Sequence, residues 1–564
     1  MLLNKGGKLV ENVRGNRHSN RIVVIGLDSA DYYLIKNWVN EGYLPTLASV
    51  IAHGSWGKIK STADIGSGTV WPSYFTGSSP AKHRGLQLHA RRIKPGTYRL
   101  AYFPPHANLV KREPFWLQLS RAGKRIAVLD VPMTYPVEGL NGIQLVGWGA
   151  HSPQWHLDSW PPELIKEVIT RFGSYPAPDD DELSPRGLTQ LSEFYTGLIT
   201  GIERKGLISR YYLDQEAWDL FITVFAEPHC VGHNFWHLTD KNHPEYNSET
   251  AKTLGDSIFN VYKLIDFEIS KIINSTPDVS FFIMSTEGMG PSYTGSHLLP
   301  EIIRRLGMSS RETSSGSMLS KTLKDPASRL RQLIPAVRWG PDSAIRNIRR
   351  NLPTSLIKLI ELGRKLVPKN TWNTWKCYLT TLGNDWQWSR AFSLPSDFNG
   401  AIRINLKGRE PYGLVEKGVE YDALCNELIH ELSQLINMDT GRKAVSEVMR
   451  VDQFHKGDYI NELPDIVVTW AGDAPIRGLY SSRIGIVTGE TLPFRTGAHR
   501  SYGFLIASGN HVVKDGNLDG ANIMDIAPTI LYLMGQPVPL DMDGKVLLDI
   551  IDDEFKINNP VSYI

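Results

Sequence analysis

The residues of this chain that could carry out chemistry are few and widely separated. They comprise a carboxylate after an apolar run, a hydroxyl within the turn at 66–77, two histidines four positions apart, a second carboxylate and a late histidine: Asp28, Ser67, His229, His233, Glu287 and His499. Carboxylate, hydroxyl and imidazole groups are the components of a metal-assisted hydrolase, in which an ion activates a nucleophile and stabilises charge on the substrate. Such chemistry requires that these distant residues meet at one place.

Short apolar runs are predicted to be the buried strands that position these residues. They cover 22–27, 125–129, 220–225, 279–284, 466–470 and 504–507. Helical patterns cover 31–40, 45–53, 250–272 and 418–437, and Gly54 is a plausible stop for the second helix. Strands that alternate with helices indicate an α/β fold with a largely parallel sheet. Open α/β sheets bind ligands beyond the carboxyl ends of their strands, so residues just past the apolar runs are candidate site residues.

The bulk composition is that of an ordinary globular protein. The chain has 564 residues, 41% hydrophobic and 21% charged, and a formal net charge of +2, which gives no argument for nucleic-acid binding. Cys230, Cys377 and Cys425 show no paired spacing, so we expect a reducing compartment rather than a disulfide framework. The first 21 residues lack an apolar signal-peptide core, and no stretch reaches the length of a membrane span. A soluble, cytoplasmic protein is therefore predicted.

One stretch, 301–390, interrupts the alternation of strands and helices. Between Lys321 and Lys369 there are 12 Lys or Arg residues against three acids, an excess of nine positive charges. Apolar residues recur among these charges at roughly helical spacing, which predicts a basic helical insertion. The insertion is either a solvated cap, or a lid or arm that contacts an anionic substrate, a phospholipid surface or another polyanion. Peripheral membrane contact through 321–369 is thus left open.

The hydroxyl-rich turn and the two central histidines suggest how a metal site would be built. A free hydroxyl is a weak nucleophile near neutral pH, so Ser67 or Thr69 would need a metal ion beside it. If the segment around His229 and His233 is helical, the two imidazoles share a face and can hold one ion. The plainer alternative is that one histidine caps the turn while the other packs in the core.

Several motifs resemble those of the type I phosphodiesterase/nucleotide pyrophosphatase family, which belongs to the alkaline phosphatase superfamily. The motifs are GLDSAD at 26–31, GYLPTL at 42–47, WPSYFTG at 71–77, PAKHRG at 80–85, TGAHRSYG at 496–503 and DIAPTI at 525–530. The resemblance spans 22–300 and 391–548 and is specific only in combination. It implies an alkaline-phosphatase-like, three-layer α/β/α core with a helical insertion and a two-metal site, usually for zinc.

The resemblance also assigns roles to individual residues. The family's nucleophile stands four residues before the tryptophan of the Trp-x-Ser segment and nine before the Thr-Gly pair, and both counts reach Ser67. Thr69 is the fallback. His499 matches the family's last histidine ligand, while His229 stands where the family has an aspartate. Glu227, close by, is a second source of that carboxylate.

The main departure from the family lies after the apolar run at 279–284. The family has Asp-His-Gly there, whereas this chain has Thr286, Glu287 and Gly288. An oxygen-rich site of Asp28, Ser67 and Glu287 would favour Mn²⁺ or Mg²⁺ over zinc. The alternative is that this metal site is weakened or lost. His297 offers a substitute imidazole nearby, and Arg500 is close enough in sequence to stabilise an anionic substrate.

Together these observations predict a metal-dependent hydrolase or transferase of phosphate mono- or diesters with a covalent intermediate on Ser67. One ion would be held by His229, His233 and His499, and the other by Asp28, Ser67 and Glu287. The expected partner is a small-molecule, lipid-linked or polysaccharide-linked phosphate ester. Alternatives are a sulfate-ester hydrolase, although no Cys-x-Pro-x-Arg segment occurs, and a non-catalytic binding module of the same fold.

The predicted domain organisation follows from the same matches. An N-terminal arm covers 1–21, the catalytic core covers 22–300 and 391–550, the basic insertion covers 301–390 and a C-terminal tail covers 551–564.

Overall fold

The computed structural model describes residues 20–85, 98, 110–149, 157–178, 187–309, 387–394, 398–489 and 495–564. The basic stretch 321–369, with its expected cap or membrane contact, lies outside the described residues, as does most of the N-terminal arm. No helix in the described ranges is long and apolar enough to cross a bilayer.

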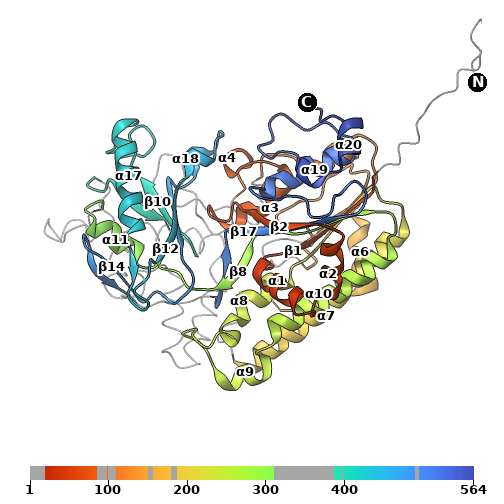
Figure 1. Ribbon diagram of the computed structural model, residues 1–564, viewed down its shortest axis with the longest axis horizontal. Helices are drawn as coiled ribbons and strands as arrows, with labels where there is room; N and C mark the ends of the chain where they lie inside the picture. The colour runs from red at the N-terminus through yellow and green to blue at the C-terminus, as the bar shows by residue number, and fades with distance from the viewer. Residues whose placement is uncertain are drawn as a thin grey trace, which may run out of the picture.

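An eight-stranded, mixed sheet forms the centre of the larger lobe (Figure 1). In spatial order its strands are β2 (Gly54–Lys60), β17 (Tyr502–Ser508), β7 (Ser280–Ser285), β1 (Ile22–Leu27), β6 (Leu220–Phe225), β3 (Ile126–Leu129), β4 (Gly142–Val146) and β5 (Asp158–Trp160). The strands from β7 to β4 are parallel to one another. Their carboxyl ends therefore meet at one edge, where a ligand site is expected.

Helices cover both faces of this sheet because its central strands are buried on both sides. In β1, Ile25 and Leu27 pack into one hydrophobic cluster, while Ile22 and Val24 pack into the other. The first cluster is covered by α1 (Tyr32–Asn40), α2 (Pro45–Ala52), α6 (Glu163–Phe172), α7 (Leu188–Gln215), α8 (Glu227–Thr239), α9 (Ser248–Leu254) and α10 (Ser257–Ser275). The second is covered by α3 (Val70–Thr76), α5 (Phe115–Arg121) and α19 (Ile526–Leu533). The predicted α/β/α layering is confirmed.

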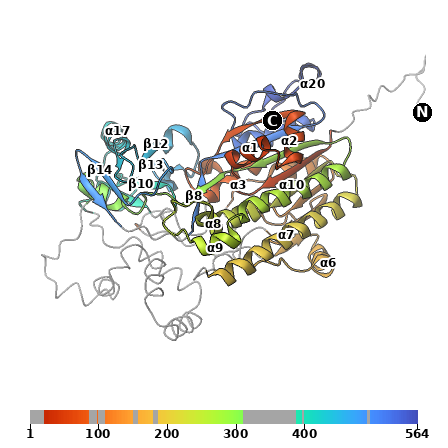
Figure 2. The ribbon, with the colours of Figure 1, turned by 60° about the horizontal axis from the view of Figure 1, so that its bottom comes forward.

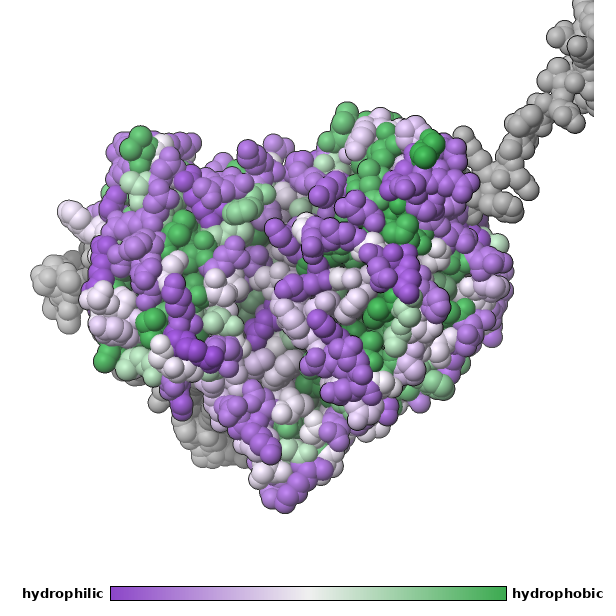
Figure 3. All heavy atoms as spheres, viewed as in Figure 1, coloured by the Kyte–Doolittle hydropathy of each residue, from purple (hydrophilic) through white to green (hydrophobic). Residues whose placement is uncertain are grey.

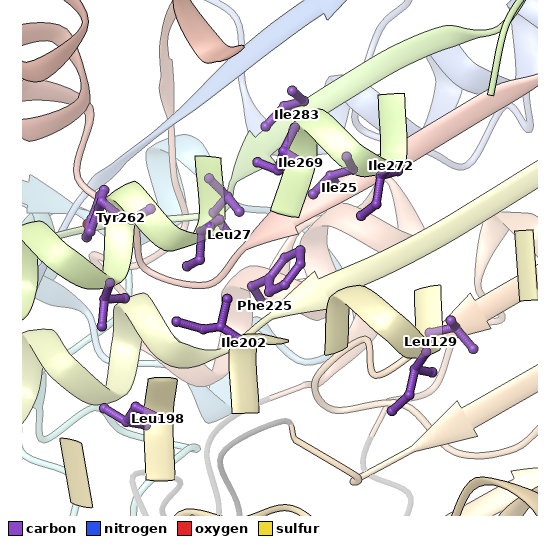
Figure 4. Packing of buried hydrophobic residues seen from close by; sticks show 14 of the residues in the cluster. Ile25, Leu27, Leu129, Leu198, Ile202, Phe225, Tyr262, Ile269, Ile272 and Ile283 are labelled. Carbon is purple, nitrogen blue, oxygen red and sulfur yellow. The ribbon is translucent and has the colours of Figure 1, made fainter. Parts of the chain in front are cut away.

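The first cluster shows how strand and helix side chains share one core. Figure 4 shows side chains from the sheet facing those of α7 and α10; the labelled residues are Ile25, Leu27, Leu129, Phe225 and Ile283 from strands and Leu198, Ile202, Tyr262, Ile269 and Ile272 from helices. Complete burial of an aliphatic side chain stabilises the fold by about 1.5–3 kcal/mol. This packing fixes the strand ends from which the site residues project.

A second, smaller lobe has its own hydrophobic core and antiparallel sheets. Its elements are α11 (Leu299–Arg305), β9 (Ala391–Leu394), β10 (Gly400–Ile404), α17 (Val419–Ser433), β11 (Ile436–Asn437), β12 (Val445–Arg450), β13 (Ile466–Trp470), β14 (Gly478–Ser481) and β15 (Gly485–Thr488). The stretch assigned from sequence to the catalytic core at 391–550 is therefore divided, and its part up to 489 packs with α11 in this lobe. Figure 2 shows the two lobes side by side, with β8 (Gly288–Pro291) and α8 between them.

Two predicted strands run differently from the parallel set. Ile466–Trp470 forms β13 as predicted, but it belongs to the antiparallel sheet of the smaller lobe. Phe504–Ala507 lies in β17, which is antiparallel to both β7 and β2. β16 (Gly497–Arg500) pairs with β8, which follows the carboxyl end of β7, and the chain enters β17 directly from β16. β17 therefore begins at the carboxyl edge of the sheet and runs antiparallel to β7. A fully buried apolar run has the same pattern in either direction, so the sequence does not reveal this.

The surface of the molecule is mixed. Hydrophilic residues cover most of the face in Figure 3, and smaller apolar areas lie between them.

Candidate metal centre

The centre is built by one helix and one strand pair at the junction of the lobes. The helix α8 begins directly after β6, and His229 and His233 lie one turn apart on it. β16 pairs antiparallel with β8, so that His499 lies opposite Met289. A Cβ on Gly497 would lie 2.2 Å from the carbonyl oxygen of Gly232 on α8. Glycine at this position thus allows β16 to approach the helix closely enough for the histidines to meet.

The three imidazoles converge on one point and are almost completely buried. His233 Nε2 lies 3.2 Å from His229 Nε2 and 3.1 Å from His499 Nε2. One ligand atom from each residue lies within 4.8 Å of the others. Within the described ranges, this is the one group of three such side chains found so arranged. The structure therefore brings together the three histidines predicted for the first ion.

The hydrogen bonds around this group suit metal binding. His233 Nδ1 lies 2.8 Å from the carbonyl oxygen of Gly497, so this nitrogen carries the proton and donates. Its Nε2 then presents a lone pair toward the other two rings. Several imidazole lone pairs that face one another repel unless a cation lies between them. A three-histidine set with an open fourth position is a common donor set for catalytic zinc. The residues present therefore fit a divalent ion.

Glu287 extends the group through His499. Its Oε1 lies 3.1 Å from His499 Nδ1, and Ser29 Oγ donates to the same oxygen at 3.1 Å. Burial, and next the charge of Asp28, raises the pKa of Glu287 well above its ordinary value, while the Ser29 hydrogen bond lowers it in part. Glu287 Oε2 is buried and has no hydrogen-bond partner among the described residues. This oxygen is the atom of Glu287 that is left to bind an ion.

Asp28 and Ser67 are positioned by the turn that precedes α3. Trp71 Nε1 donates a 2.8 Å hydrogen bond to Asp28 Oδ1. Ser67 begins a short 3₁₀ turn one helical turn before Trp71, and it is 8% exposed. Trp71 thus links the turn of Ser67 to the carboxyl end of β1. The assignment of Ser67 as nucleophile and ligand stays a prediction.

The fallback nucleophile has a structural role. Thr69 is completely buried, and its hydroxyl lies 2.8 Å from the carbonyl oxygens of both Thr62 and Gly66. A hydroxyl held in this way braces the turn, which favours Ser67 over Thr69 as the predicted nucleophile. The sequence could not separate Thr69 from Ser67, because a hydroxyl-rich turn does not show which side chain faces inward.

The segment where the chain departs from its family contacts the same turn. Ser61 Oγ donates a 2.7 Å hydrogen bond to the carbonyl oxygen of Thr286. The Thr286 hydroxyl is buried and has no hydrogen-bond partner within the described ranges. The end of β7 therefore holds Ser61, at the start of the loop that leads from β2 to Ser67, while Thr69 braces the turn itself.

Two of the other residues considered from sequence lie outside the three-histidine group. Glu227 begins α8 and accepts a 3.0 Å hydrogen bond from Tyr175, and burial raises its pKa to about 7. His297 is not part of the group, and burial lowers its pKa to about 4. From the sequence, Glu227 was an alternative carboxylate ligand and His297 an alternative imidazole ligand. Neither belongs to the three-histidine group.

Cys230 and Arg500 have structural contacts. Cys230 packs in the hydrophobic cluster with α7 and α10. Side chains alternate along a strand, so Arg500 points to the opposite face of β16 from His499. Its guanidinium donates 2.9 Å to the carbonyl oxygen of Pro291 and lies 3.5 Å from that of Gly472 in the smaller lobe. Arg500 thus links the lobes, and its expected role on a substrate anion stays a prediction.

The fold and the three-histidine group together define an α/β protein with a candidate metal centre at the carboxyl edge of its sheet. The sequence profile described as type I phosphodiesterase/nucleotide pyrophosphatase matches residues 22–353. The chain therefore belongs to this family. The predicted family relationship is confirmed.

A local match connects the chain to one curated protein. It is 41% identical over 54 residues to the 2,3-bisphosphoglycerate-independent phosphoglycerate mutase of Shewanella denitrificans. The match covers 9% of this chain and 10% of the mutase, so the chain spans about a tenth of the length of the curated relative.

Solved structures of similar architecture share little sequence with the chain. Phosphonoacetate hydrolase of Sinorhizobium meliloti, in complex with phosphonoformate, has 11% identity and a TM-score of 0.48, covering 92% of this chain and 95% of its own. Human ectonucleotide pyrophosphatase/phosphodiesterase 5 has 11% identity and a TM-score of 0.43, covering 95% and 100%.

Proposed function

We propose that this protein is a metal-dependent hydrolase or transferase of phosphate mono- or diesters, with Ser67 as the nucleophile. The observation that carries the proposal is the convergence of His229, His233 and His499 from two distant parts of the chain. Membership of the type I phosphodiesterase/nucleotide pyrophosphatase family supports the reaction class.

The donor atoms divide into two sets with different chemistry. The three imidazoles would hold one ion, and nitrogen donors of this kind suit zinc. Asp28, Ser67 and Glu287 would hold a second ion, and this oxygen-rich set favours Mn²⁺ or Mg²⁺ over zinc. When bound, such ions lower the pKa of a hydroxyl and neutralise charge on the substrate oxygens. Among the described residues Glu287 Oε2 has no hydrogen-bond partner, so it is the oxygen that this set would use.

The chain's own residues hold the nucleophile in place. Ser67 Oγ would attack phosphorus in line with the leaving group, so that its oxygen–phosphorus bond forms as the bond to the leaving alcohol breaks. Water would then release phosphate or phosphate monoester from Ser67. Thr69 braces the turn, and Ser61 anchors the start of the loop that leads to it, through hydrogen bonds to backbone carbonyl groups. A turn held in this way would limit the directions from which Ser67 Oγ can attack.

A direct experiment combines metal analysis with turnover. The purified full chain is loaded with Zn²⁺ or Mn²⁺ and assayed with bis-p-nitrophenyl phosphate, p-nitrophenyl phosphate and p-nitrophenyl sulfate. We expect bound metal, hydrolysis of a phosphate ester, and loss of hydrolysis in Ser67→Ala. Mass spectrometry of acid-quenched enzyme should place the phosphoryl group on the peptide containing Ser67.

The alternatives predict other outcomes. Faster turnover of the sulfate ester would favour a sulfate-ester hydrolase. Absence of both metal and activity would favour a non-catalytic binding module, which the replacement of the family's Asp-His pair by Thr286 and Glu287 motivates. If the same peptide still carries a phosphoryl group in Ser67→Ala, the nucleophile would be Thr69 instead of Ser67.

A further inference from the structure

Ser29, which directly follows Asp28, has a backbone conformation that is unusual for serine. Its φ is +54°, in the left-handed region that glycine occupies more readily than other residues. Its neighbours are fixed: Asp28 N donates to Phe225 O at 2.9 Å, and Ala30 N donates to Leu27 O at 3.2 Å. A non-glycine residue in this conformation is strained and persists where surrounding contacts hold it.

The contacts that hold Ser29 are those of the metal centre. Ser29 is completely buried, and its Oγ donates to Glu287 Oε1 at 3.1 Å. The same Oγ lies 3.3 Å from His499 Nδ1, and His499 Nδ1 lies 3.1 Å from Glu287 Oε1. The three polar atoms thus form a closed triangle on the side of the His499 ring away from the other histidines.

This triangle sets the orientation and tautomer of His499. A metal-binding histidine usually donates its second ring N–H to a carboxylate, which fixes the ring and strengthens the ligand nitrogen. Here Glu287 is that carboxylate, and it accepts from Nδ1 while Nε2 faces His233 at 3.1 Å. Within the described residues, Ser29 and His499 are the two groups that contact Glu287 Oε1. Removing the Ser29 hydroxyl would leave His499 as the single described donor to this oxygen, so the carboxyl group would be held less firmly against the imidazole.

The geometry excludes a nucleophilic triad. In such a triad the carboxylate and the hydroxyl bind opposite nitrogens of the imidazole. Ser29 Oγ and Glu287 Oε1 both face Nδ1 of His499, so Ser29 has no base on the side where a substrate could lie.

We infer that Ser29 is a positioning residue of the metal centre, whose hydroxyl holds Glu287 against His499 so that His499 Nε2 is directed at the ion. The inference rests on the proposed function, because it presumes an ion at the three histidines. It accounts for a strained serine at a position where glycine would relieve the backbone.

Two substitutions separate the hydroxyl from the backbone strain. Ser29→Ala removes the hydroxyl and keeps the strained φ, whereas Ser29→Gly removes both. The matched control is Asp278→Gly, since Asp278 is exposed, has a similar φ of +58° and lies before the start of β7, at the opposite end of that strand from Glu287. Each full-length variant is stripped of metal, and its Zn²⁺ affinity is measured by competition with a fluorescent chelator.

We expect Ser29→Ala and Ser29→Gly each to weaken Zn²⁺ binding by about tenfold, in the range of losses at residues that support metal ligands. The metal-free Ser29→Gly protein should unfold at the wild-type temperature or above it, because glycine relieves the strain. Asp278→Gly should keep wild-type affinity.

In the Glu287→Gln background, Ser29→Ala should have little further effect on Zn²⁺ affinity, since the hydroxyl acts through that carboxylate. The visible spectrum of the Co²⁺-loaded protein should change in Ser29→Ala and not in the control.

Other results overturn the inference. Wild-type Zn²⁺ affinity in both Ser29 variants would remove any positioning role. A lower unfolding temperature of metal-free Ser29→Gly would show that the hydroxyl serves the fold instead. If either of these results is obtained while the wild-type protein binds metal and hydrolyses phosphate esters, the role of Ser29 is refuted and the proposed function still stands. A wild-type protein that binds no metal would refute the proposed function and this inference together.

Discussion

The indole Nε1 of Trp71 donates a 2.8 Å hydrogen bond to Asp28 Oδ1, although 43 residues separate them. Both residues are buried. This bond connects the end of the central strand β1 to the helix that follows Ser67. The position of the proposed nucleophile thus depends on a carboxylate that is itself a proposed ligand.

Replacing Trp71 with phenylalanine tests this connection. Trp71→Phe retains an aromatic ring but removes the donor, and a hydrogen bond to a charged group contributes about 1.5–3 kcal/mol. We expect a loss of stability within that range and a fall in phosphate-ester turnover, measured by denaturant unfolding and initial rates. Trp160→Phe is the control, because the indole of Trp160 donates to the Leu140 carbonyl oxygen away from the centre. Equal turnover losses in both variants would contradict a role specific to Asp28.

His233 is the central member of the three-histidine group, within 3.2 Å of both other imidazoles. His233→Ala should therefore lower the zinc content by one ion per chain, and turnover should fall by more than about 100-fold, the upper range for residues that only support a ligand. Metal analysis and initial rates measure both effects. His53→Ala, at an exposed histidine, should leave both unchanged. Full zinc content in His233→Ala would place the ion elsewhere.

Thr286 stands where the family has an aspartate. Thr286→Asp should raise the affinity for a second ion, because it adds a carboxylate beside Glu287 and Asp28. Without metal the same variant should unfold at a lower temperature, since a further buried charge joins two carboxylates. Titration calorimetry with Zn²⁺ and thermal unfolding with and without metal measure these effects. Thr286→Asn, uncharged and similar in size to aspartate, should not gain affinity; an equal gain in both variants would contradict the prediction.

The sequence predicted the parts of the centre that follow from local rules. The apolar runs 22–27, 220–225 and 279–284 are strands β1, β6 and β7, and their carboxyl ends meet as parallel strands require. His229 and His233 share one face of α8 because they are four residues apart. The first prediction depends only on the direction of parallel strands, and the second depends only on the period of a helix.

The remaining features depend on contacts between distant residues. Ser29 and Glu287 are 258 positions apart, and nothing near either residue indicates their hydrogen bond or the positive φ of Ser29. The smaller lobe was not predicted, because the five residues of β13 show the same apolar run as a core strand. Thr69 was left as an alternative nucleophile because its three hydrogen bonds become visible only in the folded turn.

A last prediction concerns stability at acid pH and involves His455, which follows the short helix α18 (Val451–Phe454). Its side chain is 8% exposed, Nδ1 has no hydrogen-bond partner among the described residues, and burial lowers its pKa to about 4 against an opposing effect of Asp543. The folded protein holds this imidazole neutral, whereas the unfolded chain takes up a proton below pH about 6.5. His455 therefore has no effect on stability above that pH, and it costs about 2 kcal/mol at pH 5 and about 3 kcal/mol below pH 4. Urea unfolding at pH 7 and pH 5 should show a smaller loss of stability in His455→Gln than in the wild type. His53→Gln, at an exposed histidine, should lose as much as the wild type, and an equal loss in His455→Gln would show that His455 is not held neutral in the fold.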